Sequence, residues 1–189
     1  MSEAPRMAFA HMGIYVADIA KMADFYARAL GFSITDRAQI RGADLVFLSR
    51  NPDEHHQIVL VSGRDPVHPS TINQISFRVI SLSELRRIYT KLVDEAISSI
   101  TPINHGGAWS VYFSDPEGNR IELFVQTPWY IPPVSIPLDL DLSDNDIYRL
   151  TEAMVERTPG HMKRSEWHEH TRRRMLEEGS IEQRVPAPA

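Results

Sequence analysis

The stretch Ser110-Val111-Tyr112-Phe113-Ser114-Asp115-Pro116-Glu117-Gly118-Asn119-Arg120-Ile121-Glu122 decides the fold of this chain of 189 residues. It begins as an aromatic strand and continues, from Arg120 to Phe124, as a second strand. Asp115-Pro116 and Gly118 between them favour a tight turn, because proline fixes φ and glycine accepts a positive φ. The stretch therefore predicts a β-hairpin that places a carboxylate, Glu122, on a core strand.

Outward from this hairpin, the residues before it complete a βαβββ unit. Residues 72–80 predict a strand, residues 82–93 predict a helix with its apolar residues on one face, and a further strand is expected near 97–103. The hairpin supplies the last two strands, near 108–113 and 120–126. The order of elements is therefore strand, helix and three strands.

The first half of the chain repeats this order. A strand over 8–17 precedes a helix over 19–30, which ends at Gly31, and strands follow near 32–38, 44–49 and 56–62. The halves superpose with an offset of 63, which aligns Ile14 with Phe77 and Tyr26 with Tyr89.

This internal repeat predicts an α+β fold of two tandem βαβββ modules, module one at 8–63 and module two at 71–127, within a domain at 1–128. Neither module can easily bury both faces of its sheet alone. Side by side, the two sheets would enclose one open, barrel-like cleft, which is where a ligand site would form.

Residues 129–189 have a different character. Prolines, among them Pro132, Pro133 and Pro137, favour an extended strap. Ser143 then begins a helix that runs to about Arg157, and a charged helix follows at roughly 164–178. We expect an arm that packs on the barrel or on a partner chain, and a homodimer. The final residues are expected to be disordered.

Composition excludes several classes of function. The chain has no cysteine, so disulfides, zinc–thiolate sites and thiol catalysis are absent. Its formal net charge is −5, without the basic patch typical of a nucleic-acid partner. No apolar run is long enough to span a membrane, and the first ten residues do not resemble a signal peptide, so a cytoplasmic location is expected.

The repeat also identifies candidate metal ligands. His11 on the first strand of module one corresponds to Gln74 in module two, and Glu122 on the last strand of module two corresponds to Val59. A buried carboxylate without a partner is costly, and a metal ion or a buried cation would relieve that cost. The alternatives are a solvated Glu122 and a His11 that belongs to the core or to a sheet edge.

The hairpin resembles the final hairpin of the vicinal oxygen chelate superfamily, and the resemblance covers residues 8–127. The opening run His11-Met12-Gly13-Ile14-Tyr15-Val16 and the helix end Leu30-Gly31-Phe32 match as well. Type I extradiol dioxygenases (EC 1.13.11) are the most similar branch.

This resemblance implies a ferrous ion, with manganese or another divalent metal as alternatives, held by two His and one Glu. Glu122 and His11 match two of these ligands, whereas Gln74 stands where the family has the second His. Gln74 can coordinate through its carbonyl oxygen but is the weaker donor, and His56 is an alternative third ligand.

The resemblance also implies catalytic roles. Tyr112 matches the Tyr that hydrogen-bonds the catecholate, and His56 matches a His that acts as acid and base. His105, before Gly106, matches a supporting His only loosely and is equally explained as a solvated loop residue. His55 and His56 are also consistent with a polar start to a strand.

Three functions follow from these residues. The first is ring cleavage of a catechol-like aromatic with dioxygen at a non-haem metal. The second is a metal-dependent lyase or isomerase of the glyoxalase branch, which Val59 disfavours because such sites need a second carboxylate there. The third is a non-catalytic protein that binds an aromatic drug. Trp109, Tyr112 and Phe47 suit an aromatic ligand in each case, although core packing also explains them.

Overall fold

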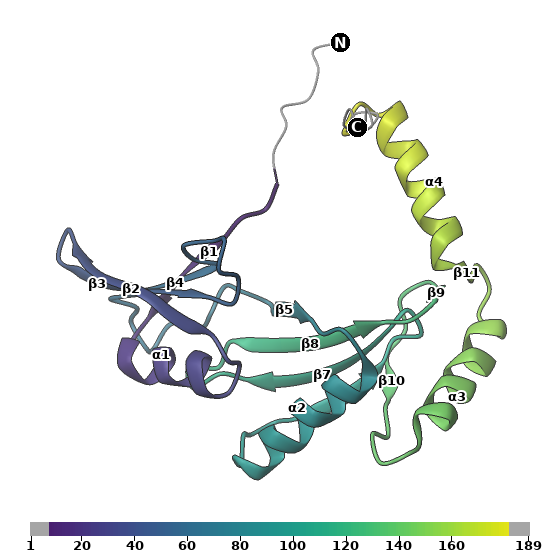
Figure 1. Cartoon of the computed structure of the whole chain (residues 1–189), viewed down its shortest axis with the longest axis horizontal. Helices are drawn as coiled ribbons and strands as arrows, with labels where there is room; N and C mark the ends of the chain where they lie inside the picture. Colours follow the sequence, from purple (N-terminus) through teal and green to yellow (C-terminus); the bar gives the residue numbers. More distant parts are fainter. Residues whose placement is uncertain (1–7, 182–189) are drawn as a thin grey trace. The chain divides into compact units, whose positions relative to one another are not determined.

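The structure is a computed structural model that describes residues 8–181 (Figure 1). The chain divides into two compact units, which we describe separately. The two-sheet unit comprises residues 10–103 and 110–125. The C-terminal unit includes residues 104–109 and the segment from Gln126 onward.

Module one of the two-sheet unit has the predicted order of elements. These are β1 (Met12–Val16), α1 (Ile19–Arg28), β2 (Ser33–Ile40), β3 (Ala43–Ser49) and β4 (Ile58–Ser62). The sheet order is β1-β4-β3-β2, with β1 parallel to β4 and the other neighbours antiparallel.

Module two repeats this order with β5 (Ile75–Arg78), α2 (Leu82–Asp94), β6 (Thr101–Asn104), β7 (Ala108–Ser114) and β8 (Arg120–Gln126). Its sheet contains β6, β7, β8 and β5 in that order, with β5 parallel to β8. The predicted α+β class is confirmed: the described residues form two main sheets and four helices, and the sheets do not close into a barrel.

The strand registers confirm the internal repeat residue by residue. Met12 pairs with Ile58 across β1 and β4, and Ile75 pairs with Ile121 across β5 and β8. Each residue of the second pair lies 63 positions after its counterpart in the first. Equivalent strand positions in the two modules therefore face equivalent sides of their sheets.

Both helices begin where the sequence provides a capping side chain. Asp18 accepts a hydrogen bond from the Lys21 backbone N–H at the start of α1, and Ser81 accepts one from Glu84 at the start of α2. Gly31, at φ +71°, follows α1 in the left-handed conformation that glycine adopts easily.

Each sheet has one buried face, where hydrophobic side chains pack together. We call the opposite face of each sheet the helix-free face. Phe25 of α1 lies 6.4 Å from Phe113 of β7, and Phe32 lies 5.6 Å from Phe77 of β5 (ring centroids). Because strand residues alternate, Ser76 and Glu122 point to the helix-free face of module two. Their neighbours Ile75 and Ile121 are buried.

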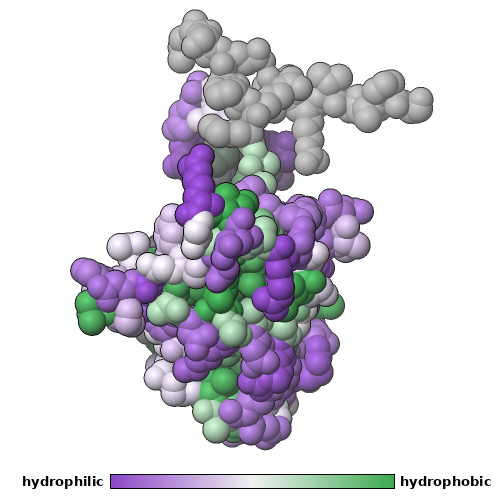
Figure 2. Space-filling view, turned by 90° about the vertical axis from the view of Figure 1, so that its left-hand side faces the viewer, coloured by the Kyte–Doolittle hydropathy of each residue, from purple (hydrophilic) through white to green (hydrophobic). Residues whose placement is uncertain are grey.

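The helix-free face of module one leaves apolar side chains in contact with solvent. Tyr15 of β1 is 68% exposed. Val59 and Phe47, which pair across β4 and β3, are half-buried. On the face drawn in Figure 2, hydrophobic residues lie among hydrophilic ones.

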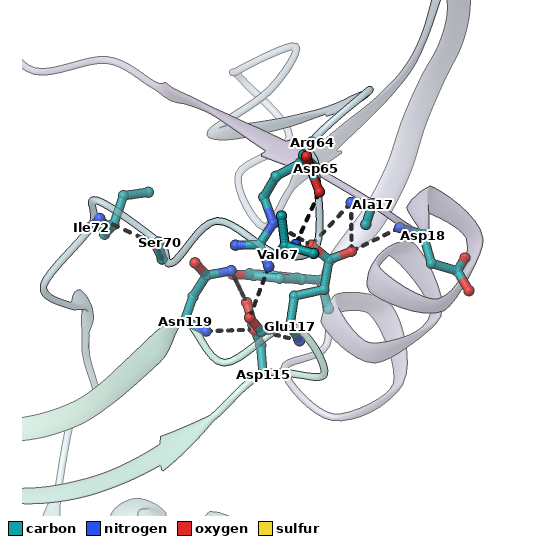
Figure 3. Close-up of polar contacts among 11 residues, drawn as sticks. Ala17, Asp18, Arg64, Asp65, Val67, Ser70, Ile72, Asp115, Glu117 and Asn119 are labelled. Atoms are coloured by element: carbon teal, nitrogen blue, oxygen red, sulfur yellow. Dashed lines mark hydrogen bonds and ion pairs between the residues drawn. The ribbon is translucent and has the colours of Figure 1, made fainter.

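The turn between β7 and β8 joins the two modules (Figure 3). The Glu117 carboxylate accepts hydrogen bonds from the backbone N–H groups of Ala17 and Asp18, each at 2.8 Å, where α1 begins. Arg64 brings its Nε to 3.1 Å from the same carboxylate, at an angle that makes an ion pair rather than a hydrogen bond. A residue of module two thus satisfies the N-terminus of a helix in module one.

Asp115 holds this turn in shape. Its carboxylate accepts hydrogen bonds from the backbone N–H groups of Glu117 and Asn119 and from the side-chain amide of Asn119. The Tyr26 hydroxyl of α1 lies 3.4 Å from the same carboxylate. Burial raises the pKa of Asp115, and these hydrogen bonds oppose the rise.

We expect Glu117→Ala to lower the free energy of unfolding by about 2–4 kcal/mol, because it removes the acceptor of two backbone N–H groups at the start of α1 and leaves Arg64 largely buried without its carboxylate. Urea denaturation measures this. The matched control is Asp24→Ala, which breaks the exposed ion pair with Arg28 and should change stability far less. Equal effects of the two variants would contradict the assigned role of Glu117.

The C-terminal unit contains short strands and two helices. They are β9 (Trp129–Tyr130), β10 (Ile136–Pro137), α3 (Asp144–Glu156), β11 (Met162–Lys163) and α4 (Arg164–Glu177), with β11 antiparallel to β9. The two helices predicted from sequence are thus confirmed. Helix α4 has no buried residue, and no helix among residues 8–181 is long and apolar enough to cross a membrane.

Thr151 of α3 organises the interior of this unit. Its fully buried hydroxyl accepts hydrogen bonds from the Asn104 amide at 2.8 Å and the Trp109 indole at 2.9 Å. The hydroxyl donates to the Ile147 carbonyl at 2.7 Å. One hydroxyl therefore satisfies two donors from the 104–109 segment.

We expect Thr151→Val to lower the free energy of unfolding by about 2–4 kcal/mol, because it leaves two donors without their acceptor. The control is Thr90→Val, which removes a similar bond, from a hydroxyl to a carbonyl four residues earlier, at an exposed position of α2. Thermal or chemical denaturation compares the two. If both variants match the wild type, Thr151 does not have the role assigned to it.

Candidate functional site

Glu122 lies at the centre of the helix-free face of module two. It is on β8, opposite Ser76 of β5, and only 8% of it is exposed. Tyr112 and Ser110 of β7 are buried beside it. The predicted burial of this carboxylate is therefore observed.

Four neutral groups donate hydrogen bonds to the Glu122 carboxylate. Tyr112 and Ser110 donate to Oε1 at 2.6 and 2.8 Å, and Ser76 and Gln74 donate to Oε2 at 2.5 and 2.9 Å. Hydrogen bonds of this kind offset the cost of burying the charge. We refer to these five residues as the Glu122 cluster.

Tyr112 is held as a neutral donor within this cluster. Burial raises its pKa to about 12, and the hydrogen bond and the negative charge of Glu122 act in the same direction. The Ser110 hydroxyl and the Arg120 guanidinium, which lies 4.0 Å from the centre of the Tyr112 ring, oppose the rise. The phenol therefore stays protonated at neutral pH.

We expect Glu122→Gln to lower the pKa of Tyr112 toward the ordinary value of about 10. The variant loses the charge that favours the protonated phenol, so more tyrosinate should form between pH 9 and 11. Tyrosinate absorbance measures the change. Adding Tyr112→Phe to the variant should remove the extra absorbance, and its persistence would mean that another tyrosine is responsible.

Imidazoles gather on module one. The His11 and His56 rings lie 4.2 Å apart, and the two Nδ1 atoms of His55 and His56 lie 2.9 Å apart. Phe47 flanks His55 and His56, with ring centroids 5.1 Å from each. Partial burial lowers the pKa of His56, and the neighbouring imidazoles lower it further. His56 is therefore neutral at pH 7 and able to accept a proton.

The structure thus divides the predicted site residues into groups. Gln74, Tyr112 and Glu122 are in contact on module two, and His11 and His56 are in contact on module one. His105 belongs to the C-terminal unit, where its Nδ1 lies 2.6 Å from the Val134 carbonyl oxygen.

The arrangement of these side chains bears on metal binding. Imidazole, amide and carboxylate donors are types that suit Fe(II) or Mn(II). Within residues 8–181, however, no three His, Asp or Glu side chains are close enough together to hold an ion. The assignment of His11, Gln74 and Glu122 as ligands stays a prediction.

Three residues on this face were not predicted from sequence: Ser76, Ser110 and Arg120. Each lies two positions along the chain from a predicted site residue, and Ser76 also pairs with Glu122 across β5 and β8. Because alternate residues of a strand share a face, this spacing was the available signal. Serine and arginine are also common surface residues, so the spacing alone did not identify these three as site residues.

Comparison with known proteins identifies the family. Residues 8–123 match the Glyoxalase/Bleomycin resistance protein/Dioxygenase superfamily. The chain belongs to this superfamily. The match covers both modules and includes the Glu122 cluster, and it confirms the resemblance drawn from the hairpin.

Relatives in this superfamily include two enzymes of Rhodococcus globerulus. Biphenyl-2,3-diol 1,2-dioxygenase 2 is 27% identical over 61% of this chain and 60% of its own length. Biphenyl-2,3-diol 1,2-dioxygenase 3 is 28% identical over 65% of this chain and 64% of its own length. The chain thus spans less than two thirds of either relative.

Solved structures agree on the fold. A glyoxylase/bleomycin resistance protein/dioxygenase domain from Frankia sp. EAN1pec has a TM-score of 0.55 at 18% identity. The alignment covers 65% of this chain and 100% of that domain. At this identity the likeness supports the superfamily fold alone.

Proposed function

We propose that this chain binds an aromatic diol against the Glu122 cluster and cleaves its ring in the extradiol manner, with dioxygen and a divalent metal. The observation that carries this proposal is the buried Tyr112 hydroxyl, 2.6 Å from Oε1 of Glu122. The pair would place a phenolic donor beside a metal-binding carboxylate. Relatives named biphenyl-2,3-diol 1,2-dioxygenases support this choice.

His11, Gln74 and Glu122 would hold the metal, with Fe(II) or Mn(II) as the ion. Such an ion, when bound, would supply the Lewis-acid and redox chemistry for the reaction of the diol with dioxygen. Gln74 would have to turn its carbonyl oxygen toward the ion, because its amide nitrogen now donates to Glu122 and Ser76. The exposed position of Gln74, just before β5, permits this rotation.

The chain's own residues would orient the diol and move its protons. Tyr112 stays protonated at neutral pH, and its single proton, which it now donates to Glu122, would have to turn to a deprotonated diol oxygen when the diol binds. His56, neutral because its pKa is lowered, would accept the proton of the other hydroxyl. His105 has no assigned role in these steps.

The Glu122 cluster also favours a second candidate, the non-catalytic binding of an aromatic ligand. Four neutral donors hydrogen-bond the carboxylate, and Gln74 replaces an imidazole ligand. This candidate predicts binding of aromatic diols that does not depend on metal. A glyoxalase-like activity has less support, because the position equivalent to Glu122 is Val59.

Ring cleavage and metal content distinguish the two candidates. Protein loaded with Fe(II) without oxygen should form a yellow product from biphenyl-2,3-diol when oxygen is added. Glu122→Gln should abolish the product and lower the bound iron, because it removes a charged ligand. Diol binding by metal-free protein, with no product at any iron load, would favour the non-catalytic candidate.

Position 74 provides a sharper test. We expect Gln74→His to raise the affinity for iron at least about tenfold, because even the outer partners of a ligand change metal affinity by about 10- to 100-fold. Gln39→His on exposed β2 adds an imidazole away from the cluster and is the control. Competition with a coloured chelator measures both. Equal affinities would exclude position 74 as a ligand position.

A further inference from the structure

Arg120 lies at one end of the Glu122 cluster. It is an exposed residue at the start of β8, two positions before Glu122, so both side chains leave the same face of the sheet. Its guanidinium lies 4.0 Å from the centre of the Tyr112 ring. This cation–π contact holds the guanidinium over the residue that donates to Glu122.

The guanidinium of Arg120 has no anionic partner in the described part of the chain. The arginines that form ion pairs there are all other ones. The nearest carboxylate along the strand, Glu122, is already bonded by its four neutral donors. A planar fork of donors is thus presented to solvent beside the cluster.

Arg78 repeats this arrangement at the opposite end. It pairs in register with Phe124, two positions after Glu122, and its guanidinium lies 5.8 Å from the centre of the Phe124 ring. Two guanidiniums against one carboxylate leave this part of the face with a net charge of +1. Such a face attracts an anion, although the whole chain carries −5.

The spacing suits a small aromatic ligand. The Arg120 guanidinium lies 4.0 Å from the centre of the Tyr112 ring, so the group that would bind an anion is within the size of a benzene ring of the phenol that would bind a diol. One ligand could therefore have vicinal hydroxyls near Tyr112 and Glu122 and a carboxylate near Arg120. Arginine binds a carboxylate through two parallel hydrogen bonds, which would fix the orientation of the ring.

We propose that the ligand of this face is an aromatic diol carrying a carboxylate, and that Arg120 binds the carboxylate. This substrate class rests on the proposed function for the diol end of the ligand. The anion-binding end rests on Arg120 alone. Arg78 contributes to the local positive charge without contacting the ligand.

Calorimetric titration of the full chain, without oxygen, tests the proposal with three probes. These are 3,4-dihydroxybenzoate, catechol and benzoate. We expect 3,4-dihydroxybenzoate to bind about tenfold more tightly than catechol, with a preference that shrinks as salt is raised. Arg120→Gln should remove the preference and leave catechol binding unchanged. Arg120→Lys should restore it in part, because lysine keeps the charge but not the fork.

Arg78→Gln is the matched control, because it removes one exposed arginine from a ring on the same face. It should weaken the binding of 3,4-dihydroxybenzoate by much less than Arg120→Gln does. Equal losses in the two variants, or equal wild-type affinities for 3,4-dihydroxybenzoate and catechol, would overturn the contact with Arg120. Circular dichroism verifies that each variant is folded.

The probes separate this inference from the proposed function. Benzoate binding that depends on Arg120, with no binding of catechol, would sustain the anion site and overturn the diol function. Catechol binding with no preference for the carboxylated probe would sustain the diol function and overturn the anion site. If none of the three probes binds, both proposals are wrong.

Discussion

The carboxylate of Glu117 accepts two backbone hydrogen bonds at the start of α1 and pairs with Arg64, and this contact ties module two to module one. It lies in a turn whose conformation is fixed by Asp115. Because the same turn sets the register of β7 and β8, the contact that joins the modules also determines where Tyr112 and Glu122 meet. Stability and site geometry therefore depend on one hairpin.

The Glu122 cluster shows how a buried charge is accommodated. Tyr112, Ser110, Ser76 and Gln74 together give the carboxylate four hydrogen bonds, which offset the cost of its burial. The same carboxylate remains a metal-ligand type. Position 74 decides between these uses, since an imidazole there would favour the ion and an amide favours the hydrogen-bonded state.

The two modules have diverged on their helix-free faces. Gly13 and Val59 of module one pair as Ser76 and Glu122 do in module two, yet one pair is small and apolar and the other is polar. Module one contributes imidazoles and an apolar surface, and module two contributes a carboxylate, hydroxyls and guanidiniums. A repeat that is conserved in backbone thus carries complementary chemistry on its two copies.

The sequence by itself determined the elements, the offset of 63 and the face on which Glu122 lies, because strand alternation and helix periodicity are local properties. The hairpin stretch likewise identified the superfamily. Tertiary structure decided which side chains touch. The bonds from Gln74 and Ser76 to Glu122 connect residues more than 45 positions apart. Glu117 bonds the backbone at the start of α1, 100 and 99 positions away in the sequence, and only the packing of the two modules brings these groups together.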